Sequence, residues 1–138
     1  MDAPTAAELQ AHPVVQAALA AAWADSLADD PALRHEEGGW IYQNLATGDI
    51  EVRRATPGRQ AAINLSNPPL ASGCVIVGKF HTHPNPSAEG WDPGPSSRDK
   101  STDAVHGVPD LIQSDSGVFV SGPDQRRGGL AGKPGYPD

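Results

Sequence analysis

The sequence predicts a small α/β protein, and three segments carry that prediction. Residues 5–28 have the apolar periodicity of a helix, residues 74–83 are the strongest strand candidate, and residues 96 to about 105 can form a second helix. The chain has 138 residues, 38% of them hydrophobic, which is enough to build the core of one domain. Its 15 glycines and 14 prolines indicate that much of the backbone forms turns, loops or tails.

The segment 5–28 is expected to be helical because it has both a start signal and an apolar stripe. Thr5 and Glu8 are spaced as a capping box, in which each side chain bonds the backbone of the other residue. The stripe consists of side chains that recur every fourth position, namely Val15, Leu19, Trp23 and Leu27. Pro13 is expected to divide the segment into two helices.

A β-hairpin is expected after the acidic turn that follows this helical segment. Aromatic and branched residues predict a strand at about 39–43, and the turn ATGD leads into a second strand, IEVRRAT, in which apolar and charged residues alternate. The pattern at 57–73 is weak and offers one short strand candidate, at 61–65.

Residues 74–83, CVIVGKFHTH, are predicted to form a central strand covered on both faces, because apolar residues occupy both parities. One parity holds Val75, Val77, Lys79, His81 and His83, and the other holds Cys74, Ile76 and Phe80. After the helix at 96–105, VPDLIQSD and SGVFVSG are expected to be two short strands around a DSG turn. The predicted domain spans residues 1–122, and residues 123–138, which have almost nothing to bury, are expected to be a flexible Gly/Pro-rich tail.

Charge and composition exclude several classes of function. The formal net charge of −7 argues against nucleic acid or an anionic membrane as the main partner, which leaves a protein or a small molecule. The single cysteine, Cys74, excludes a disulfide framework or a cysteine-built zinc site, and core packing is its expected role. No secretory signal and no membrane-spanning run is recognisable, so a cytoplasmic location is expected, with delivery by a secretion system or as part of a longer polypeptide left open.

The sequence HTHP followed by PSSRD places ligand-type residues at a spacing that suits one metal ion. His81 and His83 lie on the same side of a strand, about 7 Å apart along the backbone, and their imidazoles can converge. Zinc in a catalytic site takes three protein ligands, and Asp99, one turn into the following helix, is the natural third. Two alternatives are open: the histidines are ordinary surface residues, and Ser96 and Asp99 only cap the helix.

A third feature, HEEGGWIY, places a carboxylate directly before a Gly-Gly pair that enters a strand. The glycines permit close backbone approach, and the carboxylate could act as the general base that such a site needs. Glu36 and Glu37 both qualify, and the alternative for either is a solvated surface charge.

Together these residues resemble the JAB/MPN family of zinc metalloproteases, specifically a prokaryotic JAB-like member. Its JAMM motif is an upstream Glu, then His-x-His-Pro, then Ser-x-x-Asp, and the order here is Glu36, His81-Thr82-His83-Pro84 and Ser96-Ser97-Arg98-Asp99. The resemblance runs from about Glu36 to Val120. Glu36 is preferred over Glu37 because family members have Glu, two residues, Gly and then an apolar strand.

The resemblance implies one zinc ion per chain, held by His81, His83 and Asp99. It implies Glu36 as general base and Ser96 as hydrogen-bond donor to the water or the oxyanion. It also implies the family's fold, a mixed curved β-sheet flanked by helices in a cytidine-deaminase-like layout, with the amino-terminal helix on one face and the Ser96 helix on the other.

The gap between His83 and Ser96 is longer than expected for the family and contains Trp91, which either grips substrate or folds under its own loop. Competing ligands are weaker: Asp92 lacks a helix to fix it, and Asp103 lies further along. His35 and His106 are expected to be surface residues.

The resemblance implies hydrolysis of an amide or isopeptide bond, with a protein or peptide substrate such as a ubiquitin-like protein. Two alternatives are a bacterial polymorphic-toxin or secreted effector domain that uses the same site, and a non-catalytic MPN-like binding module. All motif residues are present, which favours an enzyme.

Overall fold

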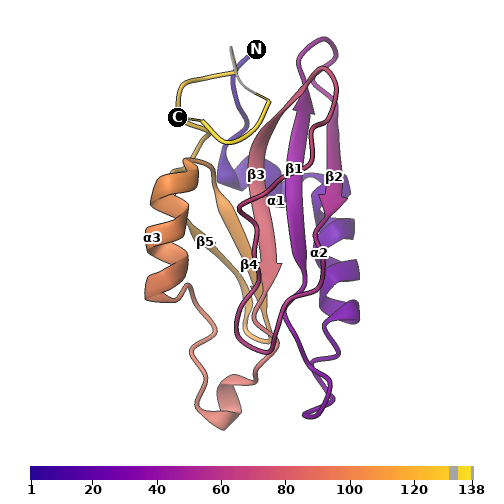
Figure 1. Ribbon diagram of the computed structural model, residues 1–138, viewed down its shortest axis with the longest axis vertical. Helices are drawn as coiled ribbons and strands as arrows, with labels where there is room; N and C mark the ends of the chain where they lie inside the picture. The colour runs from indigo at the N-terminus through magenta and orange to yellow at the C-terminus, as the bar shows by residue number, and fades with distance from the viewer. Residues whose placement is uncertain (131–133, 138) are drawn as a thin grey trace.

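In the computed structural model, which describes residues 1–130 and 134–137, a five-stranded mixed sheet lies between helices (Figure 1). In chain order the elements are α1 (Ala6–Ala11), α2 (Pro13–Asp25), β1 (Gly38–Asn44), β2 (Ile50–Arg54), β3 (Cys74–Thr82), the 3-10 turn η1 (Ser87–Glu89), α3 (Ser97–His106), β4 (Asp110–Ser114) and β5 (Gly117–Ser121). The strand order is β2-β1-β3-β4-β5; β3 and β4 are parallel and the other neighbours are antiparallel. The predicted α/β class and mixed sheet are confirmed.

The amino-terminal helices form largely for the predicted local reasons. Thr5 N donates to Glu8 Oε1 and Glu8 N donates to Thr5 Oγ1, both at 3.1 Å, which completes the capping box. Pro13 is the first residue of α2, where its missing N–H costs nothing, so the division at this proline is confirmed. The helix ends at Asp25, and Leu27 lies beyond it and is 44% exposed, so its assignment to the apolar stripe was wrong.

A β-bulge in β3 decides which side chains face the site. Ile41 pairs with Gly78 and Tyr42 pairs with Ile76, so Val77 is an extra residue that breaks the alternation. Val75, Val77 and Phe80 therefore all belong to the core that faces α1 and α2. Lys79 and His81 face the opposite side of the sheet, where they contact α3. The prediction that Val75 and Val77 share a face with the histidines was wrong.

Two apolar cores cover the two faces of the sheet. The first packs Leu9, Val15 and Leu19 of α1 and α2 on Ile41, Phe80 and Leu111. The second joins Trp40, Tyr42, Leu65, Cys74, Ile76 and Val108, which confirms a core position for Cys74.

The segment between β2 and β3 covers the second core without forming a strand, and Figure 1 shows it crossing in front of the sheet. Trp40 Nε1 donates to Leu65 O at 3.0 Å, and the Tyr42 hydroxyl donates to Pro69 O at 2.5 Å. The short strand expected at 61–65 was wrong: Leu65 O accepts from the Trp40 side chain, and Ala62 O accepts from Arg59 N within the same segment.

The carboxy-terminal segment contacts elements on both faces of the sheet. Asp124 O accepts from Ala6 N at 2.7 Å, and the Tyr136 ring stacks on His106 with centroids 4.0 Å apart while its hydroxyl donates to Leu65 O. The expectation that residues 123–138 bury almost nothing is therefore not met by the described part of the segment. Residues 131–133 and 138 of the expected tail lie outside the described residues.

Gly39 is expected to be essential to the pairing of β1 with β2. A Cβ at this position would lie 2.1 Å from Arg53 O, a backbone atom that cannot move without breaking the ladder. Gly39→Ala should destabilise the protein by about 1–3 kcal/mol or more, measured by urea unfolding. Gly135→Ala is the control, because a Cβ there meets nothing within 4 Å. Equal unfolding midpoints for the two variants would contradict this account of the β1–β2 contact.

Candidate metal centre

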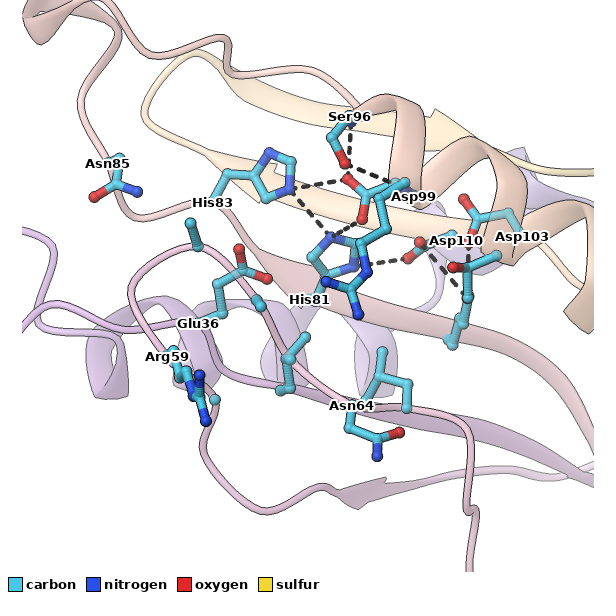
Figure 2. A pocket seen from close by; sticks show the side chains of 18 of the residues that line it. Glu36, Arg59, Asn64, His81, His83, Asn85, Ser96, Asp99, Asp103 and Asp110 are labelled. Atoms are coloured by element: carbon cyan, nitrogen blue, oxygen red, sulfur yellow. Dashed lines mark hydrogen bonds and ion pairs between the residues drawn. The ribbon is translucent and has the colours of Figure 1, made fainter.

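All five residues predicted for the site line one cavity of about 810 Å³ on the α3 side of the sheet (Figure 2). Glu36 lies just before β1, His81 is near the end of β3, and His83 follows that strand. Ser96 and Asp99 come from the start of α3. The β3–β4 crossover returns α3 to the end of the strand that carries the histidines, and the motif therefore converges.

The two imidazoles and the Asp99 carboxylate lie close together, and Asp99 faces each histidine through a different oxygen. His81 Nε2 lies 3.2 Å from His83 Nε2 and 3.3 Å from Asp99 Oδ1, and His83 Nε2 lies 3.2 Å from Asp99 Oδ2. Tetrahedral ligands at about 2.1 Å from an ion are about 3.4 Å apart. The histidines are not solvated surface residues, since their side chains are 3% and 12% exposed.

Glu36 faces the two histidines from the other side of the cavity (Figure 2). Glu36, His81 and His83 each offer a donor atom within 4.8 Å of the others, so this group could hold a metal ion. Glu36 N donates to Arg59 O at 2.7 Å and Gly58 N donates to Glu36 O at 2.8 Å, which fixes its backbone. Burial raises the pKa of the Glu36 carboxyl to about 7, so its proton is readily gained and lost near neutrality.

Glu37 belongs to a different set of contacts. Its carboxylate accepts from Arg54 Nη2 at 2.8 Å and contacts His35 Nε2 at 2.5 Å. These contacts occupy both carboxylate oxygens. The choice between the two adjacent glutamates is thus made by their neighbours, and Glu36 is the one that lines the cavity.

Ser96 and Asp99 form the capping box that was one of the two interpretations of PSSRD. Ser96 N donates to Asp99 Oδ2 at 2.9 Å and Asp99 N donates to Ser96 Oγ at 3.0 Å. The same Asp99 carboxylate faces both imidazoles, so capping fixes the orientation of a candidate ligand rather than excluding it. Burial opposes ionisation of Asp99, but hydrogen bonds from His81 and His83 lower its pKa well below the usual range. Because Ser96 Oγ accepts from the backbone, its hydroxyl proton is available to another acceptor.

The competing aspartates have other partners. Asp92 lines the cavity, but its Oδ1 accepts from Gly94 N at 2.9 Å in a local turn. Asp103 is fully buried and its Oδ1 lies 2.7 Å from Lys79 Nζ. Trp91 lines the cavity and is 43% exposed, which agrees with a side chain open to a ligand rather than one folded under its loop.

His35 and His106, which were expected at the surface, are both less exposed than that. His35 is half-buried, and the expectation for His106 was wrong, because it is 7% exposed and its Nδ1 lies 2.7 Å from Lys79 Nζ. Burial and the charge of Lys79 lower the pKa of His106 to about 4. His106 is thus neutral at pH 7 and belongs to the interior network around Lys79.

The sequence interpretation missed Asp110. Its carboxylate Oδ1 lies 3.1 Å from His81 Nδ1, and both residues are buried. The available signal was the acidic residue that opens the strand in GVPDLI, where an apolar residue would be expected in a buried strand.

Two arginines add positive charge to the cavity walls. Arg59 and Arg98 both line the cavity. Arg59 lies in the segment between β2 and β3, and Arg98 lies in the first turn of α3. Within residues 1–130 and 134–137, neither guanidinium forms an ion pair, although the chain carries a formal net charge of −7. The same cavity is also lined by carboxylates, namely Glu36, Asp92, Asp99, Asp103 and Asp110, so its walls carry charges of both signs.

No protein-family model, curated protein or solved structure matches this chain. In the described part of the chain, no helix combines the length and the apolar character that crossing a bilayer requires.

Proposed function

We propose that this protein is a zinc-dependent hydrolase of amide or isopeptide bonds, of the JAB/MPN type. The observation that carries the proposal is the convergence of two imidazoles and one carboxylate at 3.2–3.3 Å, with a second carboxylate, Glu36, in the same cavity. The order of these residues resembles the JAMM motif, although the gap between His83 and Ser96 is longer than in the family. The sheet with helices on both faces is compatible with that family's layout.

The donor set fits the metal that the proposal requires. His81, His83 and Asp99 would hold the ion, and all three line the cavity that substrate would enter; catalytic zinc sites use three protein ligands of these types. No thiolate takes part, because Cys74 is buried in the second core. Two histidines and one carboxylate also bind iron(II), so a metal measurement should quantify both elements.

Zinc held in such a site polarises a substrate carbonyl and makes water more acidic. Glu36 accepts the proton from the attacking water, whose oxygen forms the new bond to the carbonyl carbon. The Ser96 hydroxyl donates to the carbonyl oxygen as negative charge develops there. When the C–N bond breaks, Glu36 returns the proton to the leaving amine, and the products are a carboxylic acid and an amine.

The substrate in this proposal is a protein or peptide that enters beside Trp91. Arginines and carboxylates both line the cavity, so an assay should include acidic, neutral and basic peptides as well as ubiquitin-like proteins. Cleavage is best followed by mass spectrometry, which identifies the bond that breaks.

Removal of the metal is expected to abolish hydrolysis, because the remaining groups lack an electrophile for the carbonyl. The measurement compares zinc-loaded protein, protein treated with a chelator, and treated protein to which zinc is restored. Activity should fall to the uncatalysed background and return with zinc. Cleavage that persists after complete chelation, or zinc-loaded protein that cleaves none of the peptides and protein conjugates, would overturn the proposal.

A further inference from the structure

His81 uses its two ring nitrogens for different contacts, and one of them engages a buried carboxylate. Nδ1 lies 3.1 Å from Asp110 Oδ1, and the side chains of His81 and Asp110 are 3% and 1% exposed. Nε2 faces His83 and Asp99 on the other side of the ring, as Figure 2 shows. The imidazole is therefore held between the candidate metal position and an interior acceptor.

This contact selects one tautomer of the imidazole. A neutral imidazole has one N–H and one lone pair, and a carboxylate oxygen beside Nδ1 favours the proton on that nitrogen. The lone pair then lies on Nε2, which is the atom that faces the other two donors. A carboxylate in this position also fixes the rotation of the ring about its axis.

Asp110 is itself fixed by the fold. It opens β4 and pairs with Lys79 in the parallel register of β3 and β4. Its Oδ2 lies 4.0 Å from Lys79 Nζ, which also contacts Asp103 Oδ1 and His106 Nδ1 at 2.7 Å each. The buried ammonium thus lies within 4.0 Å of two buried carboxylates, Asp103 and Asp110, and compensates the Asp110 charge.

We infer that Asp110 is a positioning residue that holds His81 in the orientation and tautomer required for metal binding through Nε2. The inference rests on the proposed metal site and adds to it a residue outside the JAMM motif. It applies to His81 alone, because no described residue contacts His83 Nδ1 in the corresponding way. Asp110 therefore acts on affinity and ring orientation without touching substrate.

The test measures zinc affinity by competition with a chromophoric chelator. Asp110→Leu, which removes the acceptor, should bind zinc about 10- to 100-fold more weakly than wild type. Asp110→Asn should lose less, because its amide oxygen still accepts from Nδ1–H. Asp115→Asn is the control: Asp115 is an exposed residue in the β4–β5 turn whose carboxylate contacts Ser87.

A spectroscopic measurement separates positioning from simple loss of structure. Long-range ¹H–¹⁵N spectra of zinc-loaded wild type should show His81 protonated at Nδ1 and ligated through Nε2. Asp110→Asn should keep that pattern, and thermal unfolding of the metal-free proteins reports any loss of fold. If Asp110→Leu does not fold, the zinc affinity and the spectrum of Asp110→Asn test the inference instead.

Either of two results would overturn the inference: zinc affinities of the Asp110 variants equal to that of wild type, or His81 protonated at Nε2 in the loaded protein. Both can occur while hydrolysis is intact, so the inference can fail alone. Conversely, the protein could bind zinc as expected but cleave no amide bond. That result would contradict the proposed function and would still support the role of Asp110. If the wild-type protein binds no zinc, both the proposed function and the role of Asp110 are contradicted.

Discussion

Glu36→Gln is expected to lower kcat by a factor of about 10² to 10⁴ while zinc stays bound, because an amide cannot accept the proton of the attacking water. Glutamine has nearly the same shape as glutamate, and the backbone of Glu36 is fixed by hydrogen bonds to Arg59 and Gly58. The side chain should therefore keep its place in the cavity. The measurement is the rate of amide cleavage at saturating substrate, with zinc content determined on the same samples.

The zinc content in this experiment also distinguishes two roles for Glu36. Its carboxylate belongs to a group that could itself hold a metal ion together with His81 and His83. If Glu36 is a ligand, Glu36→Gln should lose zinc and activity together, and Asp99 would be left outside the metal shell. Asp92→Asn is the matched control, because Asp92 lines the same cavity but bonds Gly94 N. An active Glu36→Gln protein would contradict the assignment of the general base.

His83→Ala is expected to abolish tight zinc binding, because it removes one of three donors from the site. Wild-type protein should carry about one zinc ion per chain, and the variant should carry almost none after dialysis. His83 lies just beyond β3 and its side chain is 12% exposed, so the substitution should leave the apolar cores intact. Elemental analysis of both proteins, which also quantifies iron, is the measurement.

His12→Ala controls for the loss of a histidine. His12 caps α2 through a hydrogen bond from Val14 N to its Nδ1, away from the cavity, so this variant should keep its zinc. Urea unfolding of both metal-free variants tests whether the fold is retained. Full zinc content in His83→Ala would contradict the metal centre, and HTHP with PSSRD would then be a strand end followed by a capped helix.

The local elements follow from short-range patterns in the sequence. The capping boxes at Thr5 and Ser96 and the helix start at Pro13 depend on residues three or fewer positions apart, so local backbone chemistry decides them. The strongest strand is where the apolar run predicts it, at Cys74–Thr82. The three spaced elements of the candidate site were recognisable for the same reason, since each is a short segment with its own local signal.

Cross-strand contacts decide what these patterns could not. The alternation of β3 predicts one face for Val77 and His81, but pairing with β1 inserts a bulge and sends them to opposite faces. The extra residue, Val77, is tolerated because an apolar side chain is buried on either face of the sheet. The residue pattern of β3 alone does not indicate how its residues pair with those of β1.

The sequence by itself determined the main helices and strands, the α/β class and the candidates Glu36, His81, His83, Ser96 and Asp99. The resemblance preferred Glu36 over Glu37, and the tertiary structure supplied the physical reason, because Arg54 of β2 binds the second glutamate. The tertiary structure alone brought Asp110 to His81, since 29 residues separate them along the chain. Hydrogen bonds and ion pairs between distant segments depend on strand order and register, and these follow from the packing of the whole chain rather than from any local pattern.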